Sequence, residues 1–304
     1  MRFVASRRWS CLLAVLVAVV ATRASGARAM GDPALAALQV GLIRAGVYHG
    51  PVDGLPSRRT EAAVRAFQLR RGLTRDGVPG RQTRKALGRW ASYELGQRTL
   101  MGGMSGWDVA ELQFLLAWHG FPSARFNGVF SSHVLAAVKR FQRYAGLPAD
   151  GIAGGQTLRA LRGSRIATCP IELRSPTTGW LSSPYGPRWL SFHPGIDLAA
   201  SLGTPVTAAA PGRVSWAAPR GGGWGNLVVI QGRDHTAIFY AHLSQIDVAL
   251  GQEVKPGQRI GLIGSTGNST GPHLYLEVRV DNATVDPLPA LQPAPRPALS
   301  TPSS

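Results

Sequence analysis

The chain has 304 residues, of which 44% are hydrophobic and 16% are charged. This length and this composition indicate two or three globular domains. The formal net charge is +17, and the two cysteines are Cys11 and Cys169. Because Cys11 falls in a segment that we expect to be removed, the sequence excludes an internal disulfide in the mature chain.

Residues 1–29 have the pattern of a secretory signal peptide. Arg2, Arg7 and Arg8 precede an apolar run over residues 11–21, and small residues at 27 and 29 suit a signal peptidase. The apolar run is shorter than the about 20 residues that a membrane helix needs. We therefore expect a secreted protein with no stable membrane span after cleavage. An uncleaved membrane anchor is the alternative.

The charge that remains after cleavage predicts a polyanionic partner outside the cell. Loss of residues 1–29 would still leave +12, nearly all of it from Arg. Long-range attraction concentrates such a protein on polyanionic surfaces. Export argues against nucleic acid, as does the lack of a basic helix interleaved with exposed aromatics. We expect the protein to be extracellular or associated with the anionic polymers of a bacterial cell wall. The alternative is that the charge only serves solubility.

The first half of the chain contains an internal repeat. Residues 38–87 align without a gap with residues 112–161, and matched pairs include Gln39 with Gln113 and Gln68 with Gln142. A gapless match of this density indicates a duplication. In each copy apolar residues have helical spacing, and Asp-Gly or Asn-Gly pairs mark turns. We predict two small all-α domains of three short helices each, over residues 32–90 and 106–163.

These copies resemble the peptidoglycan-binding domain type 1, a three-helix module found on many wall hydrolases. The first copy carries Gly50-Pro51-Val52-Asp53-Gly54 and Ala63-Val64-x-x-Phe67-Gln68. The second keeps Ala137-Val138-x-x-Phe141-Gln142 but departs from the pattern at Phe126-Asn127-Gly128. The resemblance implies peptidoglycan as a binding partner, although such modules also serve as spacers or as contacts to a catalytic partner.

The second half of the chain is rich in expected strands. Gly or Pro clusters separate six such segments, about every ten residues. The segments are 206–210, 213–217, 227–231, 237–242, 259–263 and 273–280. We predict an antiparallel all-β domain over residues 179–289, followed by a disordered Pro-rich tail over residues 290–304.

Five side chains in this half could form one site. His193 and Asp197 flank a Pro-Gly pair, which rules out a regular helical turn, so both can bend toward one ion. His273 and Tyr275 are two residues apart on an expected strand and therefore share a face. His242 ends another apolar strand and could reach the same cleft. His and Asp are donors that zinc favours, although a lone His on a strand is more often structural.

At these residues the chain resembles the lysostaphin-like (LytM-type) zinc endopeptidases that cut peptidoglycan peptides. The motifs are Ser183-Pro-Tyr-Gly-Pro-Arg188, His193-Pro-Gly-Ile-Asp197, Tyr240-Ala-His242-Leu-Ser and Gly271-Pro-His273. The resemblance implies a zinc cofactor bound by His193, Asp197 and the residue at position 275. It also implies that His242 and His273 assist the hydrolysis of peptide cross-links.

Tyr275 departs from the family pattern, which has the second His of an H-x-H motif at this position. A phenol titrates near pH 10 in water and is a poorer ligand at neutral pH than imidazole. Tyr275 could bind the metal in an active enzyme, or border a site that another group or water completes. Alternatively, the domain is an inactive wall-binding or hydrolase-activating pseudoenzyme. Our first interpretation is a secreted zinc metalloendopeptidase; a scaffold that uses the β-domain as an interaction surface is a further alternative.

Overall fold

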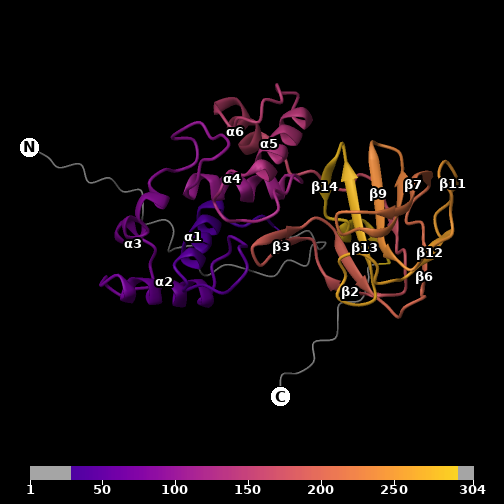
Figure 1. Cartoon of the computed structure of the whole chain (residues 1–304), viewed down its shortest axis with the longest axis horizontal. Coiled ribbons are helices and arrows are strands. Elements are labelled where there is room, and N and C mark those ends of the chain that lie inside the picture. Colours follow the sequence, from indigo (N-terminus) through magenta and orange to yellow (C-terminus); the bar gives the residue numbers. More distant parts are fainter. Residues whose placement is uncertain (1–28, 294–304) are drawn as a thin grey trace, which may run out of the picture.

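The computed structural model describes residues 29–293. Helices form the first part of the described chain and strands form the second, as Figure 1 shows. The predicted signal peptide and residues 294–304 of the predicted tail lie outside the described residues, apart from residue 29. Among the described residues, we find no helix long and apolar enough to cross a membrane.

Each predicted repeat folds into three helices, as the sequence indicates. The helices are α1 (Pro33–Arg44), α2 (Arg58–Arg70) and α3 (Arg81–Ala86), then α4 (Trp107–Trp118), α5 (Ser132–Tyr144) and α6 (Gly155–Gly163), with the short 3-10 helix η1 (Gly88–Ala91) between the repeats. The bounds of α4 and α5 equal those of α1 and α2 moved along by 74 residues. The duplication in sequence is therefore also a duplication in structure.

A buried glutamine holds the corresponding turn in each repeat. Gln39 Oε1 accepts hydrogen bonds from both N–H groups of Asp53-Gly54, at 3.0 and 2.9 Å. Gln113 Oε1 accepts in the same way from Asn127-Gly128, at 3.0 and 2.8 Å. The glycine of each pair has a φ of +67° or +68°, a conformation that favours Gly. These contacts explain why the pairs recur at this spacing.

The two repeats pack against each other through the equivalent helices α1 and α4. All 12 residues of α4 are buried, because the helix also faces its own repeat and the β-domain. The polar residues of this helix, Asp108, Glu111 and Gln113, are buried with hydrogen-bonding partners, as buried polar groups require. The rings of Trp90 and Trp107 meet edge to face at this junction, with centroids 5.9 Å apart.

The β-domain is built on an eight-stranded sheet in the order β11-β7-β8-β9-β13-β5-β2, with β14 also paired to β13. A three-stranded sheet, β10-β12-β6, contributes side chains to the same apolar core. The strands of these two sheets are β2 (Trp180–Ser183), β5 (Ile196–Ala199), β6 (Pro205–Thr207), β7 (Gly212–Arg220), β8 (Gly225–Gln231), β9 (Thr236–Leu243), β10 (Gln245–Ile246), β11 (Glu253–Val254), β12 (Arg259–Leu262), β13 (His273–Val280) and β14 (Ala283–Val285). Every pairing within them is antiparallel, as predicted.

Two short pairs of strands lie outside these sheets. β3 (Gly186–Arg188) and β4 (Ser191–His193) form a hairpin that projects toward the helices in Figure 1. β1 (Leu173–Arg174) pairs in parallel with β15 (Leu291–Gln292), which follows the 3-10 helix η2 (Leu288–Ala290). This pair corrects the predicted start of the tail at residue 290, because Leu291 is only 1% exposed and packs in the core.

Candidate active site

The five predicted site residues come together at one end of the neighbouring strands β9, β13 and β5 of the large sheet. His273 and Tyr275 lie at the start of β13, and Asp197 on β5 is the register partner of Tyr275. His193 ends β4, and His242 is the last but one residue of β9. Residues that are up to 82 positions apart along the chain thus converge, as the resemblance implies.

Alternation along β13 decides which side chains face the site. Leu274, Leu276 and Val278 are fully buried in the core. The side chains of His273 and Tyr275 therefore stand on the opposite face of the sheet. Their two-residue spacing in the sequence predicted that His273 and Tyr275 share a face.

Each of the three imidazoles is held by a backbone carbonyl at Nδ1. The carbonyls belong to Pro184 for His193 (3.0 Å), Thr266 for His242 (2.8 Å) and Gly271 for His273 (2.8 Å). Because a carbonyl only accepts, Nδ1 carries the proton in each ring. Nε2 is left for other partners, which is the arrangement that orients histidines at metal and acid–base sites.

Asp197 lies at the centre of the polar cluster. Its Oδ1 is 3.2 Å from His193 Nε2 and 3.7 Å from His273 Nε2, and its Oδ2 accepts from Arg188 Nη2 at 2.6 Å. Burial alone would raise the pKa of Asp197, but the neighbouring His193 and Arg188 outweigh it and lower the pKa. Arg188 was not among the predicted site residues, although it ends a motif on which the family resemblance rests.

The predicted catalytic histidines are also brought together. The ring centroids of His242 and His273 are 4.8 Å apart. Burial lowers the pKa of His242. The hydrogen bond to the Thr266 carbonyl acts in the opposite direction, and the neighbouring His273 lowers the pKa further. His242 also has a φ of +65°, which costs a non-glycine residue about 1–2 kcal/mol. Such strain is common at functional sites, but catalysis by this pair stays a prediction.

The ring of Tyr275 lies inside the cluster, whereas its hydroxyl is hydrogen-bonded to a residue of the same strand. The ring centroid is 5.4 Å from that of His193, 5.7 Å from Trp224 and 6.0 Å from His242. The hydroxyl donates to Glu277 Oε2 at 2.5 Å. Burial, and then the charge of Glu277, raise the pKa of Tyr275 well above its usual value of 10. At neutral pH the phenol is therefore protonated.

Glu277 connects Tyr275 to an arginine further along β13. Its carboxylate is only 1% exposed, and Oε1 accepts from Arg279 Nε at 2.5 Å. The Arg279 guanidinium in turn lies 4.3 Å from the centre of the Phe239 ring. By alternation along β13, Glu277 lies on the same face as His273 and Tyr275, but it was not among the predicted site residues.

The arrangement of donors does not match the three-ligand zinc site that the family resemblance implies. Zinc binds neutral imidazole, carboxylate or a deprotonated oxygen or sulfur. His193 and Asp197 supply two such donors, whereas Tyr275 offers a protonated phenol that is bonded to Glu277. Within residues 29–293, no three His, Cys, Asp or Glu side chains are placed to hold a metal ion. Metal binding by His193, Asp197 and Tyr275 stays a prediction, and this geometry speaks against the part played by Tyr275.

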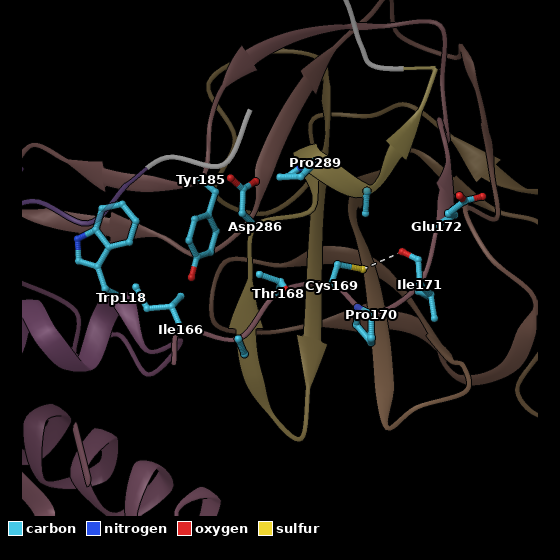
Figure 2. A pocket seen from close by; sticks show the side chains of 12 residues that line it. Trp118, Ile166, Thr168, Cys169, Pro170, Ile171, Glu172, Tyr185, Asp286 and Pro289 are labelled. Carbon is cyan, nitrogen blue, oxygen red and sulfur yellow. Dashed lines mark hydrogen bonds between the residues drawn. The ribbon is translucent and has the colours of Figure 1, made fainter. Parts of the chain in front are cut away.

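A crevice of about 420 Å³ lies apart from this cluster, where the second repeat, the connecting segment and the β-domain meet (Figure 2). Trp118, Tyr185, Cys169 and Pro289 are among its lining residues, and none of the five site residues lines it. The Cys169 thiol donates to the carbonyl of Ile171 at 3.3 Å, and burial raises its pKa. A thiol in this state is not an activated nucleophile.

Comparison with known proteins divides the chain in the same way. Residues 191–287 match the model of Peptidase family M23, and residues 31–87 and 105–161 match that of the putative peptidoglycan binding domain. The DD-carboxypeptidase/endopeptidase Mpg of Neisseria meningitidis is 43% identical over 122 residues, which are 38% of this chain and 28% of that protein. The murein hydrolase activator NlpD of Salmonella typhimurium is 39% identical over 126 residues, or 41% and 33% of the two chains.

The catalytic domain of the antimicrobial peptidase lysostaphin from Staphylococcus simulans shares 35% identity over 36% of this chain and 90% of its own, with a TM-score of 0.35. The chain matches about a third or less of the length of the two curated relatives above.

Proposed function

We propose that this protein binds peptidoglycan in the cell envelope or extracellular space, because its chain joins two peptidoglycan binding domains to a domain of Peptidase family M23. In this proposal the M23 cleft holds wall peptides without hydrolysing them through a bound metal. The observation that carries it is the hydrogen bond from the Tyr275 hydroxyl to the buried carboxylate of Glu277.

That hydrogen bond supports the proposal because position 275 is where the third zinc ligand is expected. The Tyr275 hydroxyl there acts as a hydrogen-bond donor, whereas a metal ligand has to offer a lone pair. Turning the hydroxyl toward His193 and Asp197 would leave Glu277, which is 1% exposed, without one of its two partners. Loss of a partner from a buried charged group costs about 1.5–3 kcal/mol. A metal would have to repay this cost and also remove the phenolic proton.

The remaining groups of the cleft suit a polar peptide ligand. The Nε2 atoms of His193 and His273 lie 3.2 and 3.7 Å from Asp197 Oδ1, and the Arg188 side chain is 45% exposed beside Asp197. Trp180 on β2 is 47% exposed and stands in the same row of the sheet as Ala199 and His273. This face of the sheet therefore combines hydrogen-bonding groups with an exposed aromatic side chain, as many ligand sites do.

A zinc metalloendopeptidase is the second candidate function. The observation that favours it is that His193, Asp197, His242 and His273 are all present and clustered, with each Nδ1 proton held by a carbonyl. If zinc binds, His193 and Asp197 are the donors that hold it, and its chemistry is polarisation of the scissile carbonyl. His242 and His273 would then orient water and accept its proton at Nε2.

Zinc content and peptide release separate the two functions. The mature protein, Tyr275→His and the double variant Tyr275→His with His273→Ala are dialysed, assayed for zinc and incubated with purified peptidoglycan. We expect the native protein to sediment with peptidoglycan, to retain no zinc and to release no peptides. Tyr275→His should retain zinc, and any peptide release should disappear in the double variant. A native protein that retains zinc and releases peptides would establish the second candidate instead.

A further inference from the structure

Equivalent positions of the two repeats hold the hairpin β3–β4. The N–H of Val52 donates to the carbonyl of Trp189 at 2.8 Å, and the N–H of Phe126 donates to that of Leu190 at 2.6 Å. Val52 and Phe126 correspond under the 74-residue shift of the internal repeat. Both carbonyls of the two-residue turn are thus bound by the helical part of the molecule, and β3 lies between that part and the sheet in Figure 1.

The turn itself is poorly suited to stand alone. Two-residue hairpins favour Asn-Gly or similar pairs, whereas this one contains Trp189 and Leu190. Trp189 has a φ of +51°, a left-handed conformation that is strained for an aromatic residue. Such a conformation persists where the surroundings fix it, and here the bond from Val52 ends on the same residue.

Aromatic packing and a close backbone contact join the second repeat to the β-domain. Phe192 on β4 lies with its ring centroid 5.5 Å from Trp118 at the end of α4 and 4.9 Å from Tyr185. The N–H of Thr284 on β14 donates to the carbonyl of Gly120 at 3.1 Å. A Cβ on Gly120 would lie 2.5 Å from the carbonyl oxygen of Thr284, so this contact admits only glycine without a shift.

The hairpin carries two of the charged and polar groups of the cleft. Arg188 ends β3 and donates to Asp197 Oδ2, and His193 ends β4 beside Asp197 Oδ1. Any movement of the hairpin relative to β5 therefore changes both of these contacts of Asp197.

We infer that the paired repeats are a positioning element of the M23 cleft. They fix the hairpin, and with it Arg188 and His193, in addition to any binding of the wall by the repeats. The pairing of α1 with α4 makes the two repeats one support, and the N–H groups of Val52 and Phe126 are its points of attachment. This inference concerns the position of the hairpin and holds whether the cleft only binds peptides or also cuts them.

Glycines 120 and 46 provide a matched test in the mature full-length chain. They occupy equivalent positions after α4 and α1 and have φ values of +87° and +68°, so alanine strains the backbone at either one. Only Gly120→Ala meets the β-domain, since a Cβ on Gly46 would find only the end of the Arg70 side chain, 3.8 Å away. Gly46→Ala thus controls for the strain.

Hydrogen exchange reports on the hairpin directly. We expect Gly120→Ala to speed amide exchange over residues 186–193 by at least about tenfold and to shift the ring resonances of His193. Gly46→Ala should leave both unchanged, and exchange in α5 serves to show that the second repeat stays folded. Unchanged hairpin exchange in Gly120→Ala, or an equal change in Gly46→Ala, would overturn the inference.

A second variant keeps the test decisive if Gly120→Ala unfolds the second repeat. Trp118→Phe keeps an aromatic ring in α4 but reduces the contact with Phe192. We expect faster exchange over residues 186–193 and a shifted His193 resonance, with α5 unchanged. A hairpin as protected as in the native protein would refute the coupling between repeat and cleft.

Discussion

Removal of one oxygen atom from Tyr275 isolates the interaction on which the proposed function depends. Tyr275→Phe keeps the ring among His193, His242 and Trp224 and deletes only the donor that lies 2.5 Å from Glu277 Oε2. Tyr275 is 9% exposed and Glu277 is 1% exposed, so water has little access to the vacated position.

The expected loss of stability follows from the partner of the hydroxyl. A hydrogen bond to a charged group contributes about 1.5–3 kcal/mol to stability. Arg279 still neutralises the other carboxylate oxygen, so we expect a loss of about 2 kcal/mol. Tyr185→Phe is the matched control, because the buried Tyr185 hydroxyl donates to a neutral carbonyl, that of Thr284, at 3.0 Å. Its loss should cost about 1 kcal/mol.

Urea unfolding of the native protein and both variants measures these free energies, provided that the slope m stays equal. The reasoning fails if Tyr275→Phe costs less than about 0.5 kcal/mol, or less than Tyr185→Phe. Either outcome would mean that the hydroxyl is not bound to Glu277 in solution and remains available to a metal.

Three further outcomes follow from the repeats and their contacts. Gln113→Leu should destabilise the second repeat by about 2–4 kcal/mol, because it leaves the two N–H groups of Asn127-Gly128 without an acceptor. A loss below about 1 kcal/mol in thermal or urea unfolding would contradict this. Burial lowers the pKa of His119 below 6.5, so its contribution to stability is complete above pH 6.5 and disappears as pH falls through the lowered pKa. As the pH is lowered from about 7 to about 5, the free energy of unfolding of His119→Phe should therefore increase relative to that of the native protein, and a difference that does not depend on pH would refute this expectation. A double-mutant cycle of Trp118→Ala and Phe192→Ala should give a coupling of about 0.5–1.5 kcal/mol, and strict additivity would argue against their contact in solution.

Local sequence patterns were sufficient for the repeats and for the face of β13 that bears the site. The recurrence of Gln39 and Gln113 with their turn pairs reflects hydrogen bonds within about 15 residues. The alternation of Leu274, Leu276 and Val278 likewise follows from burial on one side of a strand. Both signals are encoded in short segments, which is why the sequence reveals them.

Longer-range contacts could not be predicted from the sequence because no short pattern encodes them. The bonds between Gly120 and Thr284 join residues that are 164 positions apart. The partner of the Tyr275 hydroxyl depends on a choice of rotamer between Glu277 and the cluster of imidazoles, which alternation cannot decide. At residue 290 the Pro-rich composition predicted disorder, but a single buried leucine at 291 extends the ordered chain.

The complete burial of α4 makes the two repeats hard to separate in evolution or in the laboratory. Excision of residues 32–90 would expose the side of α4 that packs on α1, and also Trp107, which packs on Trp90. A newly exposed apolar surface of this kind invites aggregation. The end of α4 would be exposed in the same way if residues 32–163 were moved without the β-domain, because Trp118 packs on Phe192 of β4. The two repeats and the β-domain are therefore expected to be inherited or transferred as one unit.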